Sequence, residues 1–185
     1  AGTYMEMQKD ADALAALSLG YKNEAITKEE TLESLARLNL YLEIPYQAAT
    51  LIEKNIQQGS IEENEENLRL LLGAWTAARE FKKAISVIDV LAPLTGEGKL
   101  YIQKAMLLNE SGDWEGVQEA TEKALTDQEL ENPGDVYILR GMAQTELGNY
   151  AQAISSFTQA MEIGTETNKR NAEAWIDYVS DRKGS

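Results

Sequence analysis

The chain has 185 residues, of which 43% are apolar, and its formal net charge is −14 at pH 7. This apolar content can bury a continuous core, whereas the negative charge repels a phosphate backbone and argues against DNA or RNA as a partner. The sequence has no cysteine and no histidine, which excludes thiol and imidazole catalysis and the usual zinc ligands, and no stretch is apolar enough to predict a membrane span.

Residues 1–28 are predicted to be the remnant of a truncated helical repeat. Four of them lie 36 positions before equivalent residues of a later helix: Asp10, Ala13, Leu17 and Gly20 precede Tyr46, Ala49, Glu53 and Ile56. The first helix of this repeat is therefore expected to be mostly missing.

Four aromatic residues then recur at intervals of 35, 33 and 36 residues: Tyr46, Phe81, Trp114 and Tyr150. Each is followed three positions later by a small or apolar residue, which indicates one face of a helix, and each is preceded by a second amphipathic segment. The pattern predicts four helical hairpins over residues 29–62, 63–96, 97–132 and 133–168. Helix-breaking residues are expected in the segments that connect the hairpins, among them Pro93, Gly96 and Gly98.

Residues 169–185 are predicted to form a C-terminal capping helix and tail. An apolar stripe of Trp175, Tyr178 and Val179 would pack against the last hairpin, and the polar remainder would face water.

The hairpin pattern resembles the tetratricopeptide repeat (TPR), a helix–turn–helix unit of about 34 residues. Residues 134–167 match its signature best, through Tyr137, Gly141, Gly148, Tyr150, Ala153, Phe157 and Ala160. Arg140 and Lys104 depart from it where leucine is usual, and Gln144 departs where an aromatic residue is usual. The resemblance implies an all-α, right-handed superhelical solenoid with a capping helix, which serves as a non-catalytic scaffold for protein or peptide partners without a cofactor.

Shorter segments resemble the C-terminal half of exported bacterial TPR proteins that are associated with TonB–ExbB–ExbD systems. They include Ile44-Pro45-Tyr46, Ala74-Trp75, Asp113-Trp114 and Pro133-Gly134-Asp135. This resemblance implies a periplasmic protein that assists TonB-dependent uptake and contacts components of that system. The alternative is the substrate-recruiting TPR region of a larger cytoplasmic enzyme or assembly factor.

A partner-binding stripe is predicted from helix geometry, at 100° per residue. It consists of Ile102, Met106 and Asn109 in one hairpin and of Ile138, Met142 and Thr145 at the same offsets 36 residues later. Edged by Glu110 and Glu146, it would suit an apolar or amphipathic peptide with basic residues. Alternatively, these residues only pack neighbouring helices together.

Two acidic clusters are interpreted as structural. Glu62, Glu63, Glu65 and Glu66 lack the ligand spacing of a calcium loop and are expected to oppose the dipole of a helix. Asp127, Glu129 and Glu131 are expected to solvate the loop before Pro133.

Overall fold

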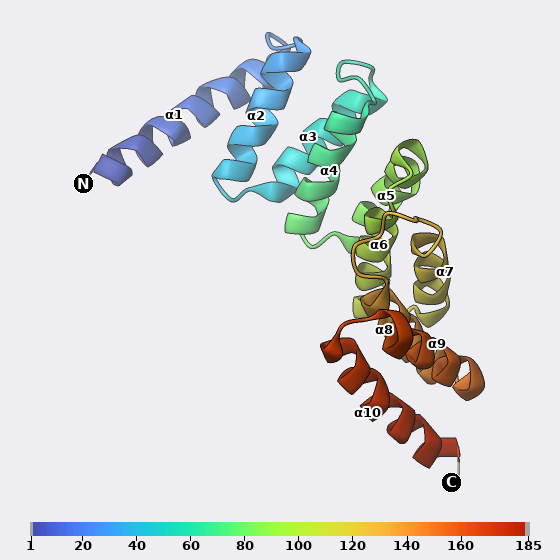
Figure 1. Ribbon diagram of the computed structural model, residues 1–185. Coiled ribbons are helices and arrows are strands. Elements are labelled where there is room, and N and C mark those ends of the chain that lie inside the picture. Colours follow the sequence, from blue (N-terminus) through green and yellow to red (C-terminus); the bar gives the residue numbers. More distant parts are fainter. Residues whose placement is uncertain (1, 184–185) are drawn as a thin grey trace. The chain divides into compact units, whose positions relative to one another are not determined.

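The computed structural model describes residues 2–183, and the side chains of residues 9–182 (Figure 1). These residues form ten helices and contain no strand, which confirms the prediction of an all-α fold. They divide after Leu91 into two compact units.

The first unit contains α1 (Gly2–Lys22), α2 (Glu29–Tyr41), α3 (Pro45–Gln57), α4 (Glu65–Ala77) and most of α5 (Phe81–Thr95). Within it, α1 packs on α2, α2 on α3, and α3 on α4. Pro45 is the first residue of α3, where its missing N–H leaves no hydrogen bond unmade. Asn64 begins α4 by accepting a hydrogen bond from the Asn67 N–H at 3.0 Å.

The second unit contains α6 (Gly98–Ser111), α7 (Trp114–Ala124), α8 (Pro133–Glu146), α9 (Tyr150–Ile163) and α10 (Glu166–Lys183). Each helix packs on the next, and α8 also contacts α6 and α10. Gly112 ends α6 in the left-handed conformation with a φ of +71°, and the Asp113 carboxylate caps α7 by accepting the Gly116 N–H at 3.0 Å.

Two of the expected breakers lie elsewhere than predicted. Pro93 is inside α5, which continues to Thr95 and stops before Gly96. The proline ring keeps a helical φ, but it removes one N–H donor and crowds the carbonyl four residues earlier, and the helix ends two residues after it. Gly98 is the first residue of α6 and does not belong to the connection.

Small residues let the helices of the last hairpin lie close together. A Cβ atom at Gly141 of α8 would lie 2.5 Å from Cε1 of Phe157, so the ring packs directly against the backbone of α8. Phe157 is fully buried, and its other side faces Trp175 of α10, with ring centroids 5.7 Å apart and an interplanar angle of 11°. Of the predicted apolar stripe on α10, Val179 is buried, Trp175 is partly buried and Tyr178 is exposed.

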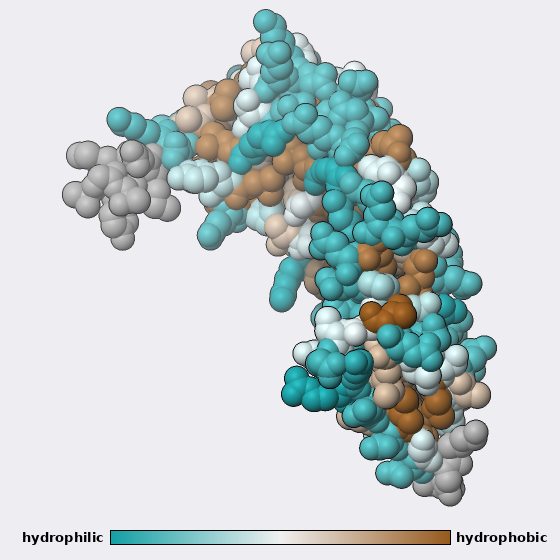
Figure 2. Space-filling view, in the orientation of Figure 1, coloured by the Kyte–Doolittle hydropathy of each residue, from teal (hydrophilic) through white to brown (hydrophobic). Residues whose placement is uncertain are grey.

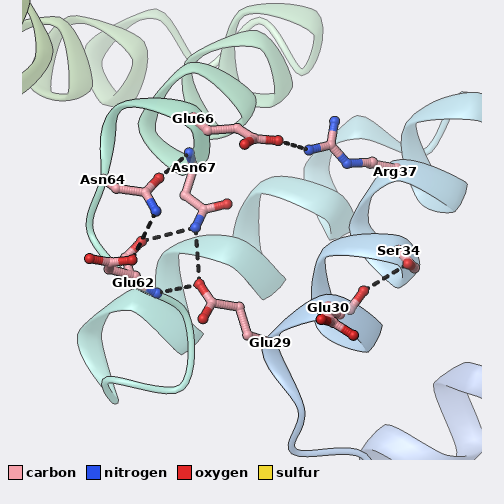
Figure 3. A network of polar contacts seen from close by, with 8 residues as sticks. All are labelled: Glu29, Glu30, Ser34, Arg37, Glu62, Asn64, Glu66 and Asn67. Carbon is pink, nitrogen blue, oxygen red and sulfur yellow. Dashed lines mark hydrogen bonds and ion pairs between the residues drawn. The ribbon is translucent and has the colours of Figure 1, made fainter.

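Polar contacts join the start of one hairpin to the start of the next. In the first unit, Oε1 of Glu29 accepts the Glu62 N–H at 2.7 Å and the Asn67 side-chain amide at 3.2 Å (Figure 3). Glu65 and Glu66 lie in the first turn of α4, as the helix-dipole interpretation requires, whereas Glu62 and Glu63 precede the helix.

In the second unit, Asp127 makes polar contacts within one hairpin. One carboxylate oxygen accepts the Gly98 N–H at 2.8 Å and the other accepts the Glu129 N–H at 2.9 Å. These backbone donors, Gly98 first, hold the pKa of Asp127 below its ordinary value of 3.8. Asp127 therefore anchors the loop to the start of α6, which the interpretation as a solvating residue missed.

The first prediction compares two glycines inside helices. Gly141→Ala should lower the free energy of unfolding by about 1–3 kcal/mol, because the new methyl group overlaps the Phe157 ring. Gly73→Ala is the matched control, since nothing lies within 4 Å of a Cβ atom there. It should raise stability by about 0.5–1 kcal/mol through helix propensity. Denaturant unfolding followed by circular dichroism measures both changes; equal changes for the two variants would contradict the close packing.

The second prediction concerns pH. Because the folded pKa of Asp127 lies below 3.8, the carboxylate stabilises the fold above that pH, and this contribution is lost as the pH falls through the folded pKa. Asp127→Ala should melt at a lower temperature than the wild type at neutral pH, and the difference should shrink as the pH is lowered below 3.8. Glu131→Ala, an exposed carboxylate in the same loop, is the control and should leave the melting temperature nearly unchanged. A difference for Asp127→Ala that is independent of pH would contradict the role of the charge.

Candidate partner-binding groove

A groove of about 610 Å³ opens in the second unit. Its walls come from α6, from the loop between α7 and α8, and from α8. Seven of its lining residues are apolar: Ile102, Met106, Leu130, Val136, Ile138, Leu139 and Met142. Figure 2 shows that apolar side chains reach the surface of the molecule in patches surrounded by hydrophilic residues.

Four of the six residues predicted for the partner-binding stripe line this groove. Ile102 and Met106 are one turn apart on α6, and Ile138 and Met142 are one turn apart on α8. The periodicity of the sequence therefore brings these side chains to one cavity. Whether they bind a partner stays a prediction.

Of these four residues, only Met106 is exposed, and the other three are partly buried. Met106 is 57% exposed, so its side chain contributes little to the folded core. Ile138 and Met142 are partly buried and pack against the core cluster that contains Ala153 and Phe157. Met106 is thus a surface residue of the groove, and the α8 side serves both the surface and the core.

The structure does not bring Asn109 and Thr145 into the groove. Thr145 is buried, and its hydroxyl donates to the Gly141 carbonyl oxygen at 2.8 Å. Asn109 is half-buried on α6 and is not among the lining residues. Asn109 and Thr145 each follow a groove methionine by three residues. A step of three residues turns a side chain by about 60° around the helix axis, and on both helices this turn points it away from the cavity.

The acidic border of the groove also differs from the predicted one, because Glu110 and Glu146 are not among its lining residues. Five other carboxylates line it, from the residue before α6, from the loop and from the first turn of α8: Glu97, Asp127, Glu129, Glu131 and Asp135. Lys99, whose ammonium lies 3.4 Å from a Glu97 oxygen, is the one basic lining residue. One end of the groove is therefore apolar and the other is strongly negative.

The acidic end is held in place by the backbone. A Cβ atom at Gly98 would lie 2.6 Å from the Cβ of Asp127 and 2.8 Å from the Ala124 carbonyl oxygen, so the end of α7 and the start of α6 are nearly in contact. Together with the hydrogen bond from Gly98 to Asp127, this contact fixes the position of Asp127, the first carboxylate of the loop, relative to the start of α6. The sequence gives no direct signal for it, because the two residues are 29 positions apart.

The described residues contain no group of three or more acidic, histidine or cysteine side chains placed to hold a metal ion. In the same part of the chain, no helix has the length and apolar character needed to cross a membrane.

No protein family and no curated protein matches the sequence. Solved structures do match the fold. The MamA protein superposes with a TM-score of 0.60 at 21% identity, over 87% of this chain and 86% of that one. The C-terminal part of a TPR repeat-containing protein from Cytophaga hutchinsonii gives 0.62 at 15% identity, over 94% and 66%. The Arabidopsis OM64 TPR domain gives 0.51 at 20% identity, over 62% and 93%. These similarities confirm the predicted TPR-type fold.

Proposed function

We propose that the protein is a non-catalytic interaction scaffold whose groove in the second unit binds an amphipathic segment of a partner protein. The observation that carries this proposal is the combination, in one cavity, of an apolar wall with an exposed methionine and an end lined by five carboxylates. The TPR-type fold of the structural neighbours supports it.

The apolar wall fits a segment with a few apolar side chains. A volume of about 610 Å³ is in the range of protein ligand sites. Methionine is flexible and polarizable, so Met106 and Met142 can adjust to side chains of different shape. Because Met106 is 57% exposed, covering it contributes about 1 kcal/mol to binding.

The acidic end selects the charge of the partner. Five carboxylates against one ammonium give this end of the groove a negative potential, which attracts lysine or arginine and repels an acidic segment. Most of these groups are exposed, so their effect is on specificity and on the rate of association, and it weakens with salt.

The third prediction tests both ends of the groove with two synthetic amphipathic peptides. They share leucines at one-turn spacing and carry either lysine or glutamate at the polar positions. The lysine peptide should bind more tightly, and its affinity should fall as salt rises. Met106→Glu should weaken its binding about tenfold or more, because a carboxylate replaces the apolar contact, while the melting temperature changes little. Fluorescence anisotropy measures the affinities.

Ile163→Glu is the matched control, because Ile163 is 50% exposed in the same unit and does not line the groove. It should leave the affinity unchanged. Glu131→Lys should reduce binding of the lysine peptide. Failure of both peptides to bind, equal binding by the Met106→Glu protein, or preference for the glutamate peptide would each contradict the proposal.

We also propose that the full-length protein is periplasmic and assists a TonB-dependent uptake system, with components of that system as partners. This proposal is supported by the segments that resemble exported TonB-associated TPR proteins, such as Ile44-Pro45-Tyr46 and Pro133-Gly134-Asp135. A negatively charged groove is compatible with a partner that presents basic residues.

The fourth prediction is that a photocrosslinking amino acid at position 106 captures TonB, ExbB or ExbD in cells, whereas the same group at position 163 does not. Cell fractionation should recover the protein in the periplasm. Recovery in the cytoplasm would contradict the periplasmic proposal, and the peptide experiment would still test the groove.

A further inference from the structure

A second and smaller pocket of the second unit has a polar lining. It measures about 220 Å³ and lies between α7, α8 and α9. Its lining includes Arg140, glutamine side chains from all three helices, and the hydroxyls of Ser155 and Ser156. Arg140 is the only charged residue among them, and no carboxylate lines this pocket although the chain carries a net charge of −14.

The pocket lies away from the groove. Ile138 and Met142, which line the groove, are each two positions from Arg140 on α8. Two residues correspond to a rotation of about 200°, which places Arg140 on the opposite face of this helix. No residue lines both cavities.

The pocket exists because α8 is polar where the TPR signature is apolar. Arg140 and Gln144 occupy positions at which leucine and an aromatic residue are usual. Gln144 is only 3% exposed, and its side-chain oxygen accepts a hydrogen bond from the Ser156 hydroxyl at 2.7 Å. Gln144 is thereby held in place, and the cavity keeps a polar wall.

Two buried polar atoms at this pocket have no hydrogen-bond partner within the described part of the chain: Nε of Arg140 and Oε1 of Gln118. Leaving a buried guanidinium N–H unpaired is costly, so such a group requires an explanation. The Arg140 side chain is always charged, and its Nε and Nη donors form a planar fork that matches the two oxygens of a carboxylate.

We propose that this pocket binds the carboxylate group of a small organic acid. Arg140 would hold the carboxylate oxygens through its guanidinium N–H donors. The Ser155 hydroxyl and the glutamine amides supply further donors, whereas the Ser156 hydroxyl already donates to Gln144. Rotating the Gln118 amide by half a turn would exchange its oxygen for an NH₂ donor. At about 30 Å³ for each water, a volume of about 220 Å³ corresponds to roughly seven waters, which is room for a small acid.

The fifth prediction is tested by an NMR titration with succinate. The backbone amides of α8 and α9 around Arg140, and its Nε–H signal, should shift and saturate at about millimolar concentrations. Succinamide has the same carbon skeleton without the charge and should cause no saturable shift. Arg140→Leu should weaken succinate binding about tenfold or more, since a charged hydrogen-bonded pair is lost. Arg170→Leu removes an exposed arginine of the same unit and should bind like the wild type.

Three results would overturn the proposal: no saturable shift with succinate, equal binding by Arg140→Leu and wild type, or an equally strong response of the same amides to inorganic phosphate. If Arg140→Leu does not fold, Arg140→Lys replaces it. Lysine keeps the charge without the planar fork, so its binding should still be clearly weaker than that of the wild type. Undiminished binding by the lysine variant would also contradict the bidentate contact.

Discussion

The close approach of paired helices is the constraint on which the rest of each unit depends. It requires residues without bulk at the contact, such as Gly141 against the Phe157 ring and Gly134, whose Cβ would lie 2.7 Å from the Cα of Gly164. Fully buried alanines serve the same purpose in both units: Ala36, Ala48, Ala49, Ala74, Ala84, Ala105, Ala143 and Ala153. Because interiors are packed as densely as crystals, an extra methyl group at such a contact must displace a neighbouring helix. The position of α8, and with it one wall of the groove, follows from this packing.

Polar contacts at the helix starts add a second constraint, which acts between successive hairpins. Glu29 contacts the segment that begins α4, and Asp135 accepts the Asn168 amide at 2.6 Å near the start of α10. Within one hairpin, the contact between Asp127 and Gly98 ties the start of α6 to the loop that follows α7. Apolar packing has little directionality, whereas these hydrogen bonds fix which residues face one another. In the second unit, Asp127 and Asp135 also line the groove, so residues that hold helix starts in place also give the groove part of its charge.

The sequence predicted the helices well because their signal is periodic. Aromatic residues at intervals of 33 to 36 positions locate the second helix of each hairpin, and the same geometry placed Ile102, Met106, Ile138 and Met142 on one surface. The turns were harder to predict from the sequence. Glu43 and Arg79 adopt a left-handed φ of 58° and 57°, a conformation that usually requires glycine and is therefore not expected at these residues. Helical periodicity shows which residues share one face of a helix, but it does not show which part of the protein packs against that face. For this reason the sequence did not show that Asn109 and Thr145 lie outside the groove lining, or that the loop before α8 supplies its acidic end.

Helix α8 departs from the repeat signature in a way that packing alone does not explain. Leucine at position 140 and an aromatic residue at position 144 would fill the space between α7, α8 and α9 with apolar atoms, which is the more stable choice. The chain instead keeps a cation and a buried amide there. Sequences that contradict the local rules of their own fold tend to do so where a site is built. Helix α8 thus lines the groove with Ile138 and Met142 on one face and the polar pocket with Arg140 on the opposite face.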